Sequence, residues 1–263
     1  MGIQAKIAAF FGDVWASKSC CAFWPWPATV YGMWTWRFTE DDYRCFTRYL
    51  QPGDIIVTKS QPYPFTNWAI GGTAFKHLGV YTGPVMGMKE RAHGFITGPK
   101  TLGISHIHTG KAKRGEFERT VTHAISEGVV CQDLLRVTSH VDYMMAVRPW
   151  KTKEEQVKIV ETALSQVGLG YNFDFTPEGP KEFYCTELGA FCLKVAEINL
   201  PDAAQRRVSL WGKKGPVYLA DSFIANYAPV CCSVSSLEPE FFRSSDYGDI
   251  IRQKLMKADN AGE

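Results

Sequence analysis

Residues 183–188 read Phe-Tyr-Cys-Thr-Glu-Leu and open the most informative segment of this sequence. The apolar residues that follow recur at helical spacing, so we predict a helix from about Cys185 to Ala196. A helix N-terminus carries partial positive charge and N–H groups that have no partner within the helix. Both stabilise a thiolate, and the same N–H groups can hold an oxyanion. We therefore predict that Cys185 is a nucleophile whose thiol pKa is lowered from about 8.5 towards neutrality.

Two histidines upstream of this segment are candidates to act with the thiol. His77 begins one strand-like segment, and His123 lies within another. A histidine beside a thiol can take its proton and later deliver it to the leaving group, while a third polar group fixes the histidine tautomer. If the two strands are neighbours, His77 would pair with Cys185. Either His123 or Glu127 would then orient His77.

Strand-like segments precede the helical ones along the chain. The predicted strands are 54–58, 78–81, 120–125, 128–131 and 143–148, and the predicted helices are 153–167 and 185–196. This order predicts an α+β fold in which an antiparallel sheet packs against the helix that bears the cysteine. Residues 84–115 are predicted to form a long insertion loop.

Three motifs in this order resemble a known family. They are His-x-Gly-x-Tyr at 77–81, Tyr-x-x-Asp-Phe at 171–175 and Phe-Tyr-Cys-Thr-Glu-Leu at 183–188. The sequence is similar to the circularly permuted branch of the NlpC/P60 papain-like hydrolases, in particular to the YiiX/YebB-like group. The resemblance covers about residues 50–200 and implies a permuted papain-like fold, in which the histidine strand precedes the nucleophile helix.

Carried over to this chain, the resemblance implies a role for each matching residue. Cys185 would be the nucleophile, His77 the general base and acid, and His123 the third polar residue. Asp54 matches the opening strand motif and is expected to be structural. Tyr184 and Tyr171 are candidates either to donate to an oxyanion or to pack in the core.

The composition excludes several classes of protein. The chain has 263 residues, of which 45% are hydrophobic and 21% are charged, so it is not disordered or fibrous. The formal net charge is only +2, which gives no support to a nucleic-acid partner.

Cysteine and histidine spacing predicts no metal and no cofactor. The eight cysteines include two vicinal pairs, 20–21 and 231–232, but no CxxC pair. Because adjacent cysteines rarely meet disulfide geometry, we expect reduced thiols. His106-x-His108 is interpreted as part of a surface loop.

The N-terminal region is rich in tryptophan and carries no recognisable signal peptide, which predicts synthesis in the cytoplasm. Residues 19–36 have no charge, but Pro25 and Pro27 interrupt them. The segment Trp15–Trp36 either packs on the core or contacts a membrane surface.

Together these features predict three regions and one principal function. The regions are a Trp/Pro-rich extension (1–49), a catalytic domain (50–200) and a C-terminal extension that packs on the core (201–263). The resemblance implies a cysteine hydrolase that cleaves amide bonds through an acyl-enzyme, most of all in peptidoglycan stem peptides. Without an export signal, such an enzyme would be phage- or virion-associated or otherwise delivered to the envelope.

Two other hypotheses stay open. The first is a lipid-directed acyltransferase or lipid-amide hydrolase that docks through the tryptophan-rich segment. The second is a catalytically silent structural or interaction module.

Overall fold

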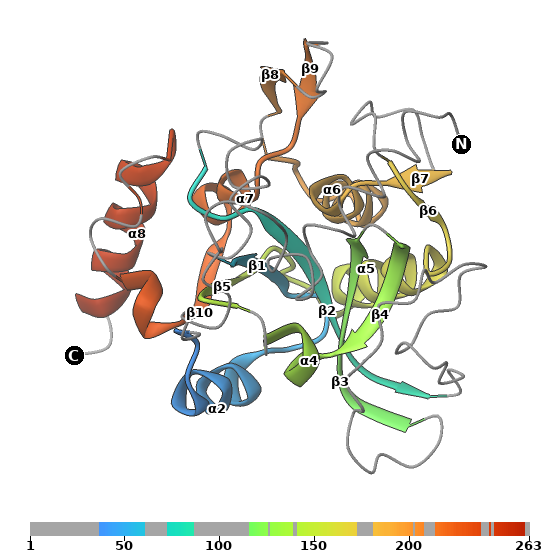
Figure 1. Cartoon of the computed structure of the whole chain (residues 1–263), viewed down its shortest axis with the longest axis horizontal. Coiled ribbons are helices and arrows are strands. Elements are labelled where there is room, and N and C mark those ends of the chain that lie inside the picture. The colour runs from blue at the N-terminus through green and yellow to red at the C-terminus, as the bar shows by residue number, and fades with distance from the viewer. Residues whose placement is uncertain are drawn as a thin grey trace, which may run out of the picture.

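A six-stranded antiparallel sheet forms the centre of the molecule (Figure 1). The computed structural model describes residues 37–60, 73–86, 116–125, 127–138, 141–172, 181–201, 203–207, 214–237, 242 and 245–260. The strand order is β10-β5-β1-β2-β3-β4. The strands are β1 (Ile55–Lys59), β2 (His77–Met86), β3 (Glu116–Ile125), β4 (Gly128–Asp133), β5 (Tyr143–Arg148) and β10 (Ala228–Cys232).

Helices and two small sheets surround this sheet. The helices are α2 (Glu40–Tyr49), α4 (Leu134–Thr138), α5 (Lys153–Ser165), α6 (Cys185–Val195), α7 (Ala220–Asn226) and α8 (Gly248–Asn260), with a 3₁₀ turn, η2 (Val234–Leu237). Strands β6 (Gly170–Tyr171) and β7 (Glu182–Phe183) pair in parallel, and β8 (Ala204–Arg207) and β9 (Lys214–Val217) pair antiparallel. None of the helices in the described ranges has the length and apolar character needed to cross a bilayer.

Both faces of the sheet are buried, as the alternation of β1 shows. Ile55 and Val57 pack into the larger core together with side chains of α5 and α6. Ile56, between them, packs into a second core with Phe46 of α2 and Leu134 of α4. The period of two along a strand thus places α5 and α6 on one face and α2 and α4 on the other.

The predicted α+β class and the antiparallel sheet are confirmed. The predicted strand 143–148 coincides with β5, and the predicted helix from Cys185 coincides with α6. Helix α6 lies close against β2 because Gly189 has no side chain: a Cβ there would stand 2.6 Å from Leu78 Cδ2. Gly189 therefore brings the cysteine helix onto the strand that begins with His77.

Residues after 200 contribute directly to the sheet and to the position of β2. Strand β10 pairs with β5 at the sheet edge, where its Pro229 and a bulge are tolerated. The buried Asp221 of α7 accepts backbone N–H bonds from Ala74 at 2.6 Å and Phe75 at 2.8 Å, and Ser245 donates to the same carboxylate. This clamp holds the chain just before β2.

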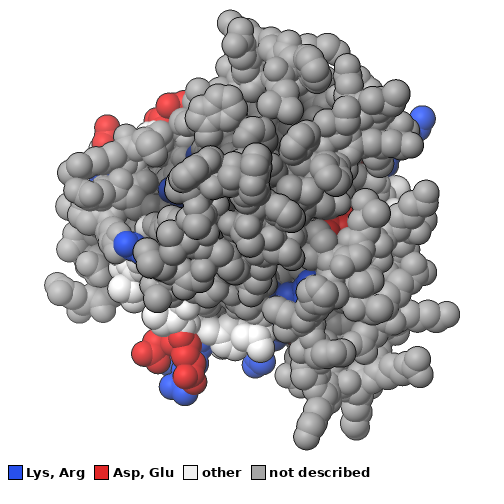
Figure 2. Space-filling model, viewed as in Figure 1, with Lys and Arg blue, Asp and Glu red and all other residues white. Residues whose placement is uncertain are grey.

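A second buried carboxylate ties β1 to β5. Both oxygens of Asp54 accept from Arg148, each at 2.8 Å, and the Gln51 N–H also donates to it. On the face drawn in Figure 2, acidic and basic side chains lie side by side over α2, where Arg44 pairs with Glu40 at 2.7 Å.

Candidate active site

The thiol of Cys185 stands at the first residue of α6 and is 6% exposed. Tyr184 precedes it as the extended N-cap residue, so the N-terminal N–H groups of α6 surround the sulfur. The backbone N–H groups of Leu78 in β2, of Thr186 and of Cys185 itself lie near enough to the sulfur to favour its thiolate form. Because Leu78 follows His77, the sulfur lies at the beginning of the histidine strand.

Burial changes the expected ionisation of this thiol. Desolvation raises the pKa of Cys185 to about 11, although the three backbone donors act in the opposite direction. The prediction of a lowered pKa is therefore wrong for the protein without a bound substrate. The helix N-terminus does favour the thiolate, but burial of the sulfur destabilises the thiolate more than the backbone N–H groups stabilise it. The resting thiol is protonated at neutral pH.

Three polar side chains on adjacent strands form a hydrogen-bonded chain. His77 Nε2 lies 2.8 Å from His123 Nδ1, and His123 Nε2 lies 3.2 Å from Gln132 Oε1. The sheet register makes this possible, since Gly79 stands opposite His123 in the β2–β3 pair and Val121 stands opposite Gln132 in the β3–β4 pair. A Cβ on Gly79 would stand 2.6 Å from Val121 Cγ1, so the glycine permits this close packing.

Both imidazoles are neutral at physiological pH. Burial lowers the pKa of His77 to about 4. Burial, together with the charge of the neighbouring His77, lowers the pKa of His123 to about 3. Because Nε2 of His77 is turned towards His123, Nδ1 is the ring nitrogen left to accept a proton.

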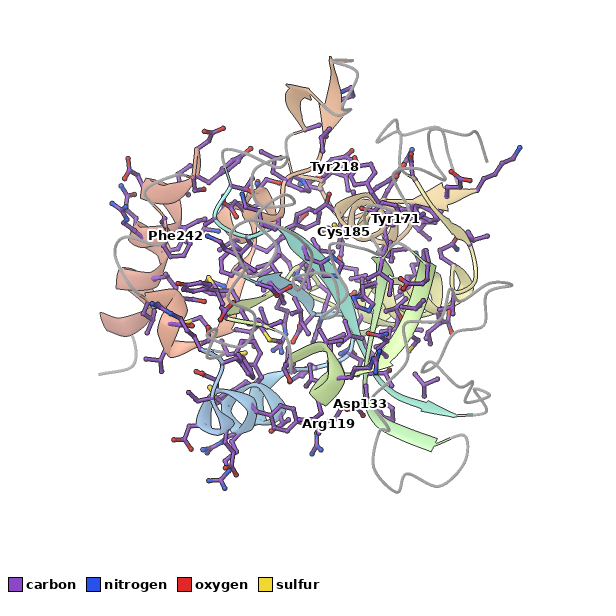
Figure 3. The ribbon with its side chains drawn as sticks, in the orientation of Figure 1. Arg119, Asp133, Tyr171, Cys185, Tyr218 and Phe242 are labelled. Carbon is purple, nitrogen blue, oxygen red and sulfur yellow. The ribbon has the colours of Figure 1, made fainter. Side chains whose placement is uncertain are left out.

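The other predicted residues are placed differently. Glu127 lies in the turn beyond β3; burial lowers the pKa of Arg136, and the charge of Glu127 acts in the opposite direction. Tyr184 packs its buried ring with Val217 and Leu219. Tyr171 is near enough to Cys185 for the two to interact electrostatically, and burial raises its pKa well above the usual value. Figure 3 shows Tyr171 and Tyr218 beside Cys185, and Thr186 donates to the Tyr218 carbonyl at 2.7 Å.

Two site residues were not singled out from the sequence. One is Gln132, whose only signal is its place on the strand next to the strand of His123. The other is Glu187, in the first turn of α6, which accepts from the Tyr184 N–H at 3.3 Å and from Asn172 Nδ2 at 3.2 Å. Burial raises the pKa of Glu187 to about 7. The sequence pattern that could have indicated Glu187 is an acidic residue at the third position of the predicted helix, which is typical of helix capping.

Several predictions fall outside the described residues, among them the segment Trp15–Trp36, the pair His106 and His108, and most of the insertion loop. Across the described ranges, no three His, Cys, Asp or Glu side chains gather in a way that could hold a metal ion.

Comparison with known proteins gives one family and one solved structure. Residues 49–207 match the model of the family described as permuted papain-like amidase enzymes, YaeF/YiiX, C92 family. The chain is also similar to the crystal structure of the metalloprotein yiiX from Escherichia coli O157:H7. Sequence identity is 16% and the TM-score is 0.45, over 70% of this chain and 96% of that one. No curated protein matches the sequence.

Proposed function

This chain belongs to the permuted papain-like amidase family, and we propose that its nucleophile is Cys185, its general base and acid is His77, and its orienting residue is His123. One observation carries this assignment. Helix α6, which begins with Cys185, packs on Leu78 of β2 through Gly189, and the neighbouring His77 lies 2.8 Å from His123 Nδ1 through its Nε2. This arrangement supports a site in which the thiol of Cys185, the base His77 and the orienting group His123 act together.

The first step joins proton transfer to attack, since both partners rest in their neutral forms. The Cys185 S–H proton passes to Nδ1 of His77 while the sulfur forms a bond to the carbonyl carbon of an amide. The carbonyl oxygen becomes an oxyanion, which the N–H groups at the start of α6 stabilise. Substrate that covers the site also removes water, which strengthens these hydrogen bonds.

The intermediate then collapses and the C–N bond breaks. His77 gives its proton to the departing nitrogen, which leaves as an amine, and the acyl group stays on Cys185 as a thioester. Water next attacks the thioester carbon while His77 takes a proton from the water. The C–S bond then breaks, and His77 returns this proton to the departing sulfur. The products are a carboxylic acid and the free thiol, so the enzyme is regenerated without any redox change.

For the substrate, we propose the amide bonds of peptidoglycan stem peptides, acted on by a phage- or virion-associated enzyme. The order of the three motifs, which resembles the permuted branch of the NlpC/P60 hydrolases, supports this choice. The tryptophan-rich segment Trp15–Trp36, which carries no charge from residue 19 onwards, favours a second candidate, the amide of a membrane lipid.

The test offers both amides to the same enzyme. Purified stem peptides and vesicles that contain an N-acyl amide lipid are incubated with the protein, and products and protein adducts are followed by mass spectrometry. We expect cleavage of the stem peptide and an acyl adduct on Cys185. Cys185→Ala should abolish both, whereas Cys192→Ala, which removes a buried thiol from the same helix, should keep them.

Cleavage of the lipid amide alone would replace the proposed substrate with the second candidate. If neither amide is cleaved and no adduct forms on Cys185, the chain is better treated as a silent structural module.

A further inference from the structure

The chain from His77 to His123 does not end at the second histidine. It continues to Gln132 on β4, whose side chain is 7% exposed and whose Oε1 lies 3.2 Å from His123 Nε2. A neutral imidazole has one N–H donor and one acceptor nitrogen. In such a chain, the group at one end decides where every proton lies.

The order of protons follows from the acceptor at Gln132. An amide oxygen only accepts, so Nε2 of His123 carries the hydrogen and Nδ1 of His123 is an acceptor. The partner nitrogen, Nε2 of His77, must then donate. This leaves a lone pair on Nδ1 of His77. With the reverse order, Nδ1 would carry a hydrogen and would be unable to accept the thiol proton.

We propose that Gln132 is a positioning residue that sets the tautomers of both histidines, so that His77 offers a base at Nδ1. This inference rests on the proposed function, in which His77 takes the thiol proton. It assigns the side chain a role that acts through His123 and His77 rather than on the substrate.

The surroundings of the chain support this order. Burial keeps both imidazoles neutral, so a single donor order runs through them. Arg136 of α4 is a charged neighbour of His123, and its positive charge opposes protonation of that ring. Gln132 on β4 stands opposite Val121 of β3, which comes two residues before His123. The register of the β3–β4 hairpin therefore places the Gln132 amide beside the His123 ring.

The test reads the tautomers directly in the resting protein. Long-range ¹H–¹⁵N correlation spectra distinguish an N–H at Nδ1 from one at Nε2, and we expect Nε2–H on both histidines. Gln132→Leu removes the acceptor and should give a mixture at His77. Gln132→Glu keeps an acceptor and should retain the Nε2–H pattern. Gln166→Leu, at the end of α5, is the matched control and should change neither ring.

Turnover gives a second readout that a purely structural role would not move. Gln132→Leu should lower kcat by about 10- to 100-fold with KM nearly unchanged. Gln132→Glu should keep kcat and shift the acidic limb of the pH profile upwards, since its carboxylate favours imidazolium.

The two proposals can fail separately. An Nδ1–H on His77 in the unaltered protein, or unchanged tautomers in Gln132→Leu, overturns this inference. The expected tautomers in a protein that cleaves no amide overturn the proposed function instead. If Gln132→Leu does not fold, the spectra of the unaltered protein and of Gln132→Glu still decide the question.

Discussion

Strands β2, β3 and β4 carry two buried polar clusters that differ in how they end. One is the chain of His77, His123 and Gln132. The other, here called the threonine cluster, consists of Thr82, Thr120, Thr122 and Cys131, all buried. Thr120 Oγ1 lies 2.8 Å from Thr82 Oγ1 and donates to the Gly83 carbonyl at 2.7 Å.

The threonine cluster closes on the backbone, whereas the histidine chain leaves a ring nitrogen for the thiol. A cluster that ends on backbone carbonyls satisfies its own polar groups and stabilises the sheet. A chain whose last group holds a lone pair can exchange a proton. Burial raises the pKa of both cysteines, but Cys131 lies among threonine hydroxyls whereas Cys185 stands at a helix N-terminus.

Matched substitutions on β2 should separate the two clusters most clearly. His77→Ala is expected to lower kcat on a cleaved amide by roughly 100- to 10,000-fold, because it removes the proposed general base and acid. Thr82→Val should leave kcat nearly unchanged and lower the free energy of unfolding. Steady-state kinetics and urea denaturation of both variants provide the check. A large loss of kcat in Thr82→Val would end the comparison.

Glu187 shares a property with each cluster. Its pKa is shifted, as in the histidine chain, and it accepts a backbone hydrogen bond from Tyr184, so it also binds backbone, as the threonine cluster does. Its folded-state pKa is raised from 4.5 to about 7, so the folded protein binds more protons than the unfolded chain between these values. Stability from this group is therefore lost as pH rises through that window. Glu187→Gln should gain stability relative to the unaltered protein by up to about 3 kcal/mol, reaching its full value above pH 7.

Denaturation curves of the two proteins at several pH values measure this difference. The lowered pKa values of His77 and His123 affect both proteins alike and cancel. A stability difference that stays constant from pH 4 to pH 8 would contradict the raised pKa.

Alkylation rates compare the thiols of Cys185 and Cys131 directly. Since the pKa of Cys185 is about 11, its labelling by iodoacetamide should rise about 100-fold from pH 7 to pH 9 and level off only near pH 11. Cys131, which is fully buried, should label only when the protein unfolds. Peptide mass spectrometry resolves the two sites. A plateau for Cys185 below pH 7 would show a preformed thiolate and refute the neutral pair.

The smallest effect is expected from Thr120→Val. This change removes the donor to the Gly83 carbonyl and the partner of Thr82, and should cost about 1–2 kcal/mol of unfolding free energy. The rate of amide cleavage should stay the same. Urea denaturation measures the first quantity and product analysis the second, and a change in rate without a loss of stability would argue that this cluster also serves the reaction.

Patterns among neighbouring residues in the sequence predicted several of the individual helices and strands. The spacing of apolar residues predicted the helix from Cys185, and an apolar run that Pro149 ends predicted the strand 143–148. The strands of His77 and His123 were found near their true positions. Helix α2 was missed although Thr39 and Asp42 form a capping box at its start.

What could not be predicted depends on contacts between distant residues. Gln132 reaches His123 only through the hairpin register, and no pattern along the chain marks it. The direction of the Cys185 pKa was wrong because the helix N-terminus is local, whereas burial comes from the whole fold.

The clamp of Asp221 on Ala74 has a consequence for the order of events during synthesis. The two residues are 147 positions apart, so the strand that carries His77 leaves the ribosome well before the carboxylate that holds the residues just before this strand. Ser245, the other partner of that carboxylate, follows later still. On a growing chain the clamp therefore closes late, after both Cys185 and His77 have emerged. Until then the nascent polypeptide carries Cys185 and His77 without the Asp221 contacts that fix the chain just before β2.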